Sequence, residues 1–424
     1  MTLDVFINEL KCGRLYSTED RGIVFDYSDE YVSNPEAIPL SVSLPLSKKT
    51  FPQKECIPYF YGLLPEGEVK RKISANLHIS ESSTLKLLEA LGGECAGTVS
   101  LFNAEEEYKI PKNIYEFNED NYRLITEEEI AALIKNSISV PVVNAISDYR
   151  LSLAGAQEKI SLAYIDKKWY VPLNGAPSTH IIKPPRTDCK DISANEYLCM
   201  TIAKKILSLV PEVQLLEIKG KEETYKVFCI ERYDRKITKD ADKTFIMRLH
   251  QEDFCQALGI MSDNKYQNDG GPGVADIINL IREKSSMPIV DIQRAIELLI
   301  FQLFIGNCDA HGKNYSLVFD EGIRLAPAYD IVSTVVYPPL TRRLSMKVGS
   351  YYELERLSLS HLHETFAKCN IKANTVNKVI EQIKGKIELV DKFIQEDDIA
   401  KQNPELLKLI LDWMKKVSEL MFCK

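Results

Sequence analysis

The sequence predicts an α+β protein with two lobes, and three observations lead to that expectation. The chain has 424 residues, which is more than one hydrophobic core usually serves. Strand-like segments dominate between residues 150 and 235, and helix-like segments dominate beyond residue 250. Polar motifs lie near the junction of these halves, which suggests two lobes that close over a cleft, a common place for ligand sites.

The composition narrows the class of protein. With 45% hydrophobic and 27% charged residues, the chain is typical of an ordinary soluble globular protein. The net charge of −8 argues against a chain that grips nucleic acid alone through a broad basic surface, although DNA contact through a partner is compatible with it.

Cysteine usage and the apolar segments indicate a cytoplasmic protein. The ten cysteines form no CxxC pair, so neither a zinc site nor a disulfide framework is expected. Reduced thiols fit the cytosol. The N-terminus has no signal pattern, and the longest apolar runs are about half as long as a membrane span, so no membrane contact is expected.

Residues 1–105 are predicted to form a small α+β subdomain. Its expected elements are strands at 3–10, 22–28 and 96–102 and a helix at 83–93 that glycine ends. The charged segment 106–125, which contains Pro111, is the expected linker.

Residues 126–235 are predicted to form a strand-rich lobe, and residues 236–424 a helical lobe. The first begins with a helix for which Thr126 is a suitable N-cap. Its further elements are strands at 159–165, 168–173, 180–185, 213–220 and 224–234 and a helix at 193–210. The second has helices at 295–305, 376–394 and 406–421 and strands at 314–319 and 323–331.

The segment IGNCDAHGKN, which ends at Asn314, concentrates polar side chains directly after a buried helix. Gly306 is well suited to end that helix, so the polar residues are expected on a loop with a rigid anchor. Asp309 and Asn314 belong to this loop. The predicted hairpin that follows returns the chain, so Asp330 should lie beside Asn314.

These three residues suit phosphoryl transfer. Asp309 can accept the proton of an attacking hydroxyl, while the amide of Asn314 and the carboxylate of Asp330 hold Mg²⁺ against phosphate oxygens. Protein kinases have the same Asp-x-x-x-x-Asn loop followed by a metal-binding aspartate. Two alternatives remain open: these side chains only cap turns, or the chain is a small-molecule kinase with the same pattern.

The segment LSLAGAQEK, residues 151–159, has the small residues of a phosphate-binding loop. Ala154, Gly155 and Ala156 would let backbone N–H groups approach phosphate oxygens, and Lys159 is expected to contact the nucleotide as well. A simple turn between strands would have the same sequence.

The rest of the strand-rich half supplies further nucleotide contacts. Lys183 lies on an apolar strand, where it needs a partner or an anion. Glu196 on the next helix could pair with Lys183 and orient it toward the α/β-phosphates. Adenine is expected to meet backbone groups around Glu231 and Tyr233, and Asp234 either reaches a ribose hydroxyl or caps the strand.

The order of these segments favours one architecture. Loop, lysine, glutamate, hinge, catalytic aspartate, asparagine and metal-binding aspartate follow one another as a bilobal protein-kinase-like fold requires, with ATP and Mg²⁺ as cofactors. The predicted fold is therefore α+β, with a small N-terminal α+β subdomain, a β-rich N-lobe and a mainly helical C-lobe.

Several segments resemble the signatures of the HipA family of bacterial serine/threonine kinases. They are LSLAGAQEK, IERYDR, LHQEDFCQALG, IGNCDAHGKN and AYDI, together with LSVSLPL, FYGLLPEG and LLEALGGECAGTVSLF in the N-terminal part. The resemblance covers essentially the whole chain. It implies the toxin of a toxin–antitoxin module that a helix-turn-helix antitoxin neutralises, with DNA contacted only through that antitoxin.

The resemblance also implies a substrate class and residue roles. The substrate would be an aminoacyl-tRNA synthetase, notably the glutamyl enzyme, whose phosphorylation stalls translation and arrests growth. Asp309 would be the catalytic base, Asn314 and Asp330 would hold Mg²⁺, and Lys183 would contact phosphate. Ser152 matches the autophosphorylated serine of the family, where a phosphate would repel the phosphates of ATP and switch the enzyme off.

Some positions and one alternative function stay open. His311 could orient Asp309, touch a phosphate or only pack, and Lys313 could neutralise charge near the γ-phosphate. Cys308 stands where relatives often have threonine. The segment 268–273 (NDGGPG) suits a flexible connector, or a contact with substrate or antitoxin. The alternative to an active kinase is an inactive kinase fold that acts as corepressor with its antitoxin.

Overall fold

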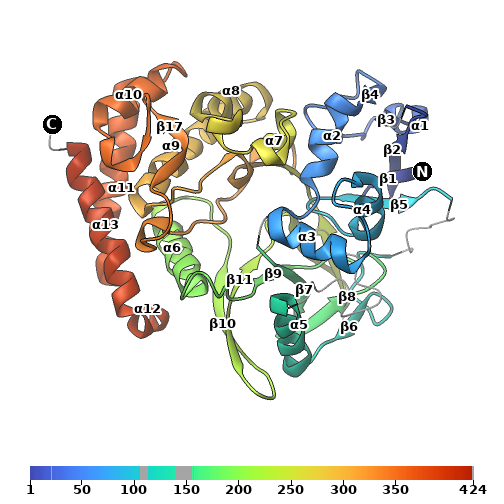
Figure 1. Ribbon diagram of the computed structural model, residues 1–424, viewed down its shortest axis with the longest axis horizontal. Helices are drawn as coiled ribbons and strands as arrows, with labels where there is room; N and C mark the ends of the chain where they lie inside the picture. The colour runs from blue at the N-terminus through green and yellow to red at the C-terminus, as the bar shows by residue number, and fades with distance from the viewer. Residues whose placement is uncertain (21, 106–112, 140–154, 156, 423–424) are drawn as a thin grey trace. The chain divides into compact units, whose positions relative to one another are not determined.

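The computed structural model describes residues 1–20, 22–105, 113–139, 155 and 157–422. These residues form two compact units. Figure 1 colours the chain by residue number. Unit 1 consists of Met1–Pro184, Leu216–Asp263 and Val318–Asp320, and unit 2 of Pro185–Leu215, Asn264–Leu317 and Glu321–Lys424. The boundaries of these units are set by contacts between residues and do not test the predicted division. The subdomain, the linker and the two lobes therefore stay a prediction.

Unit 1 begins with a five-stranded antiparallel sheet in the order β4-β3-β2-β1-β5. Its strands are β1 (Thr2–Ile7), β2 (Leu10–Ser17), β3 (Ile23–Tyr27), β4 (Thr50–Pro52) and β5 (Val99–Asn103). The accompanying helices are α1 (Asp29–Val32), α2 (Gln53–Gly62), α3 (Gly67–Asn76) and α4 (Thr84–Leu91). Alternate residues of β1 face the core, as the sequence pattern predicted.

The single strand predicted for residues 3–10 is wrong. The chain turns at Asn8, whose φ of 52° is left-handed, and β2 already starts at Leu10. Asparagine tolerates this conformation better than most residues, so a tight hairpin forms inside an apparently continuous apolar alternation.

Unit 1 also contains a six-stranded sheet in the order β10-β11-β9-β7-β8-β6. Its strands are β6 (Tyr122–Leu124), β7 (Ile160–Ile165), β8 (Lys168–Pro172), β9 (His180–Lys183), β10 (Val213–Lys219) and β11 (Thr224–Glu231). Helix α5 (Glu127–Ser139) contributes Ile130 and Ile134 to the core of this sheet. The predicted N-cap is confirmed, because the Thr126 hydroxyl accepts from Glu129 N at 3.2 Å.

A hairpin that the sequence did not predict follows this sheet. Strands β12 (Arg235–Asp240) and β13 (Lys243–Arg248) pair in antiparallel register, although residues from 236 onward were assigned to the helical half. Unit 1 is completed by β14 (His250–Asp253), where the side chain of Asp253 caps the short helix α7 (Phe254–Ala257).

A buried ionic network joins the segment between α4 and β5 to the strand-rich part of unit 1. Glu94 Oε1 lies 3.0 Å from Arg235 Nη2 and 3.3 Å from Arg232 Nη1. Asp234 Oδ2 lies 2.8 Å from Arg232 Nη2 and 2.9 Å from Arg235 Nη1. Burial alone would raise the pKa of Glu94, but the nearby guanidinium groups hold it below its ordinary value.

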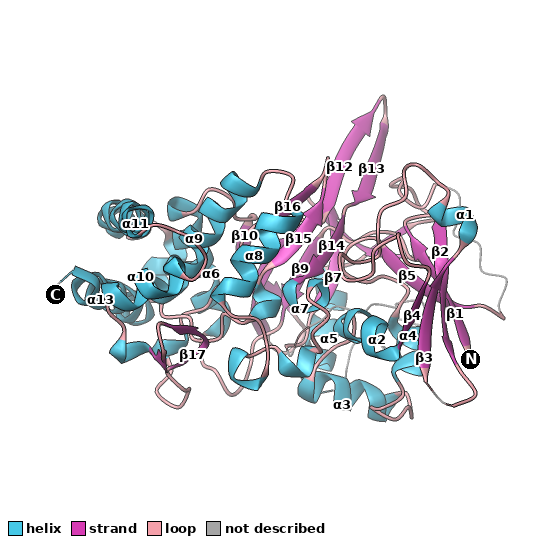
Figure 2. Cartoon of the chain, turned by 90° about the horizontal axis from the view of Figure 1, so that it is seen from above, coloured by secondary structure: helices cyan, strands magenta, loops and turns pink. Residues whose placement is uncertain are grey.

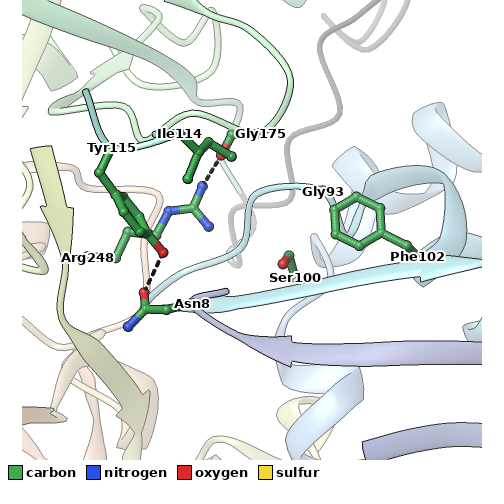
Figure 3. Close-up of a pocket in the computed structure, with 8 residues that line it drawn as sticks. All are labelled: Asn8, Gly93, Ser100, Phe102, Ile114, Tyr115, Gly175 and Arg248. Carbon is green, nitrogen blue, oxygen red and sulfur yellow. Dashed lines mark hydrogen bonds between the residues drawn. The ribbon is translucent and has the colours of Figure 1, made fainter. Parts of the chain in front are cut away.

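Figure 3 shows a small pocket beside this network. Arg248 on β13 donates from Nη2 to the carbonyl of Gly175 at 2.5 Å, and the hydroxyl of Tyr115 donates to Asn8 Oδ1 at 3.1 Å. The pocket is lined by Asn8, Gly93, Ser100, Phe102, Ile114, Tyr115, Gly175 and Arg248. Its walls therefore come from both parts of unit 1, which the hydrogen bonds hold together.

Unit 2 is mainly helical (Figure 2). Its helices are α6 (Ile192–Ile206), α8 (Val274–Lys284), α9 (Pro288–Ile305), α10 (Leu359–Ala367), α11 (Ala373–Ile394), α12 (Asp398–Gln402) and α13 (Pro404–Phe422). Its short strands are β16 (Ile323–Leu325), β17 (Arg343–Val348) and β18 (Tyr351–Glu353), and β15 (Ser316–Phe319) begins in it. Helix α9 packs against α8, α11 and α13. Within the described residues, no helix has both the length and the apolar character of a membrane span.

Candidate active site

The candidate catalytic loop begins where α9 ends, at Gly306, as the sequence predicted. Gly306 is the C-cap of α9, with φ 74° and ψ 35°, a left-handed conformation. A Cβ at this position would overlap Val335 Cγ2 and lie 2.8 Å from the ring of Trp413. Both backbone conformation and close packing therefore require glycine here.

Asn307 fixes the direction in which the loop leaves the helix. Its amide nitrogen donates to Gln302 Oε1 at 3.0 Å, and its Oδ1 accepts from the backbone N–H of Asp309 at 3.0 Å. The same amide nitrogen lies 3.5 Å from the backbone oxygen of Asp330. Cys308, which follows Asn307, is buried. Burial raises the pKa of its thiol to about 11, so the thiol is a poor nucleophile.

The expected juxtaposition of Asn314 and Asp330 is confirmed. Asn314 belongs to a short 3₁₀ turn (Gly312–Asn314), and its Nδ2 donates to Asp330 Oδ2 at 2.9 Å. Asp330 has a φ of 56°, which is rare for a residue other than glycine and costs of order 1 kcal/mol or more. Such backbone strain is typical of functional sites, where the surrounding structure enforces it.

Between Asp309 and Asp330, hydrogen bonds that link side chains to backbone groups hold the loop. Asn314 Oδ1 accepts from the backbone N–H of His311 at 3.3 Å. The hydroxyl of Tyr329 donates to the backbone oxygen of Lys313 at 2.6 Å. The side chains of His311 and Lys313 are both largely buried, whereas Asp309 is exposed. The one exposed carboxylate is thus presented by a loop whose other members are anchored.

Tyr266 contacts this loop, which no pattern in the sequence predicted. Its hydroxyl donates to Asp309 Oδ1 at 2.9 Å, and its ring meets that of His311 edge-on, with centroids 5.3 Å apart. Arg186 was also not foreseen. Its pKa is raised first by the hydrogen bond to Asp188 and further by the charge of Asp309. Neither residue belongs to a pattern that sequence spacing would reveal.

Helix α6 carries Glu196, whose exposed fraction is 1%. The neighbouring Asn195 donates to the backbone oxygen of Ser333 at 3.0 Å and accepts from its backbone N–H at 2.9 Å. This pair of bonds ties α6 to the segment that follows Asp330. The predicted ion pair between Glu196 and Lys183 joins residues of different units and stays a prediction.

Lys183 lies in unit 1, at the end of β9, and is 5% exposed. Its ammonium group lies 5.6 Å from the centroid of the Phe228 ring, and Phe228 is its cross-strand neighbour on β11. A buried lysine on a central strand matches the residue type expected for a phosphate contact.

Gly155 is the one described residue of the predicted phosphate loop between residues 151 and 156; Ser152, Ala154 and Ala156 lie outside the described residues. Gly155 has a φ of 122°, and its oxygen accepts from the backbone N–H of Glu66 at 3.0 Å. Lys159 Nζ donates to the backbone oxygen of Gln157 at 3.1 Å. Gly155 is therefore bonded to the segment FYGLLPEG of the N-terminal part.

The predicted adenine hinge follows β11. Glu231 pairs with His180 in the sheet, and Tyr233 donates its hydroxyl to Gln251 Oε1 at 2.7 Å. Asp234 does not suit a ribose contact. It is 5% exposed, and its carboxylate is bonded to Arg232, Arg235 and the backbone N–H of Gly97, which lies 2.7 Å away. Since these donors occupy it, Asp234 serves the ionic network and is removed from the expected nucleotide contacts.

The site and the fold together define a class of protein before any comparison. An exposed aspartate on an Asp-x-x-x-x-Asn loop, with a later aspartate against the asparagine, is the arrangement of the kinase catalytic loop. The chain belongs to the HipA family of serine/threonine kinases. Residues 151–390 match the HipA-like C-terminal domain, and residues 3–102 match the HipA N-terminal domain.

Individual relatives agree with this membership. The chain is 37% identical over 355 residues to the Sinorhizobium fredii protein named "Putative kinase Y4mE", covering 83% of this chain and 82% of the relative. It is 29% identical over 366 residues to the serine/threonine-protein kinase toxin HipA of Shewanella oneidensis, covering 83% and 80%.

A solved structure shows that the fold is the same. This structure is the complex of Shewanella oneidensis HipA and HipB with operator DNA. Its matching chain superposes with a TM-score of 0.82 at 23% identity, covering 99% of this chain and 97% of that one. The predicted α+β kinase-like fold is thereby confirmed.

Proposed function

We propose that this chain transfers the terminal phosphoryl group of ATP to a serine or threonine of a protein. The single observation that carries the proposal is the contact between Asn314 and Asp330, which lies on the same loop system as Asp309. Loops that only cap turns would not need a strained aspartate brought back to the asparagine.

In unit 2, Asp309 accepts the proton of the attacking hydroxyl, which a carboxylate within hydrogen-bond reach can do. Asn314 and Asp330 hold Mg²⁺, and they fit this ion because amide and carboxylate oxygens are the hard donors that it prefers. When bound, Mg²⁺ supplies neutralisation of phosphate charge. Lys313 adds positive charge near the γ-phosphate, and His311 keeps the loop in place.

Lys183, in unit 1, binds the α/β-phosphates, and Glu196, which belongs to α6 of unit 2, orients it, as in protein kinases. Backbone N–H groups of residues 154–156 and the side chain of Lys159 bind phosphate oxygens. Backbone groups at Glu231 and Tyr233 receive the adenine. This scheme assigns no residue to the ribose contact, because Asp234 is unsuited to it.

The substrate and the partner are proposed by analogy with the family. The solved Shewanella oneidensis structure contains HipA together with HipB and operator DNA. By analogy, a helix-turn-helix antitoxin neutralises this chain and connects it to DNA. The substrate is an aminoacyl-tRNA synthetase, in the first place the glutamyl enzyme, and its phosphorylation arrests growth. Phosphorylation of Ser152 switches the enzyme off, because the added charge repels the phosphates of ATP.

The test is phosphate transfer by the purified chain. Full-length protein is incubated with γ-labelled ATP, Mg²⁺ and purified glutamyl-tRNA synthetase, and labelled sites are mapped by mass spectrometry. Wild type should label the synthetase, and in its absence Ser152. Asp309→Ala and Asp330→Ala should lower the rate by at least about a hundredfold. Asp320→Ala, on the turn between β15 and β16, is the matched control and should retain full activity.

Two outcomes would contradict the proposal. If the wild type labels no protein, Ser152 included, the chain is not an active protein kinase. If a small metabolite rather than a protein stimulates ATP consumption, the chain belongs with the small-molecule kinases. Growth arrest upon expression without antitoxin provides a second readout, since a corepressor without kinase activity would not arrest growth.

A further inference from the structure

We infer that Tyr266 is a positioning residue for Asp309, an assignment that rests on the proposed function because it takes Asp309 as the base. The Tyr266 hydroxyl donates to Asp309 Oδ1 at 2.9 Å. Its ring packs edge-on against His311, with an interplanar angle of 80°. One side chain therefore contacts two members of the catalytic loop.

The hydrogen bond matters because a carboxylate can rotate about its last side-chain bond. Asp309 is exposed, so packing alone does not fix that rotation. Its backbone N–H is held by Asn307 at 3.0 Å, which fixes the main chain but not the carboxylate plane. The bond from Tyr266 fixes the plane, so the base meets the substrate hydroxyl without reorganising.

Tyr266 can do this because its own backbone is fixed. Its carbonyl oxygen accepts from the backbone N–H groups of Asp269 at 2.9 Å and Gly271 at 2.8 Å. Just before it, the backbone oxygen of Lys265 accepts from Gly312 N at 3.3 Å, so this segment is bonded to the catalytic loop itself. Just after it, Gln267 Oε1 accepts from the backbone N–H of Lys347 at 2.7 Å.

The glycine-rich segment 268–273 gives this arrangement its shape. A Cβ at Gly271 would lie 2.6 Å from the carbonyl carbon of Lys265 and would overlap the backbone oxygen of Asn264. Gly270 has a φ of 95°, which favours glycine as well. The glycines thus allow the chain to fold back on residues 264–266. This fixed fold accounts for the glycines of NDGGPG better than a flexible connector would.

A different role for the Tyr266 hydroxyl would be to block the base as an internal mimic of the substrate. A blocking element has to move away before the substrate binds. The backbone around Tyr266 is bonded to Gly312, to Lys347 and within itself, so only a rotation of the tyrosine side chain could free Asp309, and that rotation would lose the ring contact with His311. The geometry therefore favours a fixed support.

The test compares Tyr266→Phe with wild type in the full-length chain, using ATP, Mg²⁺ and the protein substrate. We expect kcat to fall about tenfold, because one charge-assisted hydrogen bond is lost, while the KM for ATP and the melting temperature stay unchanged. Tyr16→Phe is the matched control. It removes a 2.9 Å tyrosine–aspartate bond, to Asp26 on the N-terminal sheet, and should leave kcat unchanged.

A second variant, Gly271→Ala, tests whether the backbone fold of residues 264–266 positions Tyr266. It keeps the hydroxyl group of Tyr266 but forces residues 264–266 to shift, and it should therefore also lower kcat. An unchanged or raised kcat for Tyr266→Phe would overturn the inference, as would a loss of kcat accompanied by a lower melting temperature. If wild type transfers no phosphate to any protein, the proposed function itself has failed; an active wild type with an equally active Tyr266→Phe refutes only this inference.

Discussion

The amide nitrogen of Asn314 lies 2.9 Å from Oδ2 of Asp330, a residue 16 positions later in the chain. Strands β15 and β16 carry the chain out and back between them. In this arrangement the amide neutralises part of the carboxylate charge, and the pair offers hard oxygen atoms on one side of the loop that carries Asp309.

This pairing predicts how Asn314→Asp should behave. The variant keeps an oxygen donor but places two carboxylates side by side, so without a cation they repel each other. We expect a melting temperature several degrees below wild type in the absence of Mg²⁺, and a larger stabilisation by millimolar Mg²⁺ than wild type shows. Thermal unfolding with and without the ion measures both. Equal shifts in the two proteins would argue against a metal site at this pair.

The end of α9 provides a stability prediction with an internal control. Gly306→Ala should lower the free energy of unfolding by about 2–4 kcal/mol, because alanine is strained at φ 74° and its Cβ would overlap Val335. Gly385, in the middle of α11, has no atom within 4 Å of a built Cβ. Gly385→Ala should therefore raise the stability by about 0.5–1 kcal/mol. Denaturant titrations of both variants would show whether the two glycines differ in sign.

The catalytic loop could be predicted from the sequence because its geometry is local. Gly306 marks the helix end, the polar residues follow at once, and a short hairpin brings Asp330 back to Asn314. Each step depends on a turn or a period that neighbouring residues determine. The same reasoning predicted the strand alternation of β1, although it missed the turn at Asn8.

The contacts that sequence reasoning missed join segments far apart in the chain. Tyr266 precedes Asp309 by 43 positions, and its placement depends on loop backbone rather than on a periodic element. Arg235 and Glu94 are 141 positions apart. From the sequence alone, Asp234 could equally make a ribose contact or cap the strand. Its arginine neighbours do not reveal that Glu94, between α4 and β5, would join them.

The network around Glu94 should contribute strongly to the stability of unit 1. Glu94→Gln leaves Arg232 and Arg235 buried with less compensating charge, so we expect a loss of about 3–5 kcal/mol. The exposed pair of Lys48 and Glu55 is the control, and Glu55→Gln should cost less than about 1 kcal/mol. Unfolding free energies at pH 7 measure both. A loss at Glu94 no larger than at Glu55 would mean that the network adds nothing beyond a surface pair.

The same carboxyl predicts an acid-dependent change in stability. The pKa of Glu94 in the folded protein is below its ordinary value of 4.5, so the folded state binds fewer protons than the unfolded one just below that pH. Its stabilising contribution is complete above about pH 4.5 and is lost as the pH falls through the folded pKa. Wild type should thus lose more stability than Glu94→Gln as the pH falls below about 4.5, which unfolding free energies measured at decreasing pH would show.

His250 predicts a second change in stability at a higher pH. Its Nε2 lies 3.0 Å from the backbone oxygen of Leu40, which can only accept, and Nδ1 lies 2.9 Å from the Thr98 hydroxyl. Burial lowers the pKa of His250 to about 4, against a partly opposing effect of the Leu40 bond. The folded state therefore resists protonation that the unfolded chain accepts near its ordinary value of 6.5.

Stability linked to His250 should be complete above pH 6.5 and should decrease as the pH falls toward about 4, by roughly 3 kcal/mol in total. His250→Gln keeps a donor for Leu40 but does not titrate, so its unfolding free energy should change less over this interval. His180, whose pKa burial also lowers to about 4, remains in both proteins, and the difference between them isolates His250. Parallel curves for the two proteins from pH 7 to 4.5 would show that the folded and unfolded states protonate His250 alike, contrary to its buried, neutral environment.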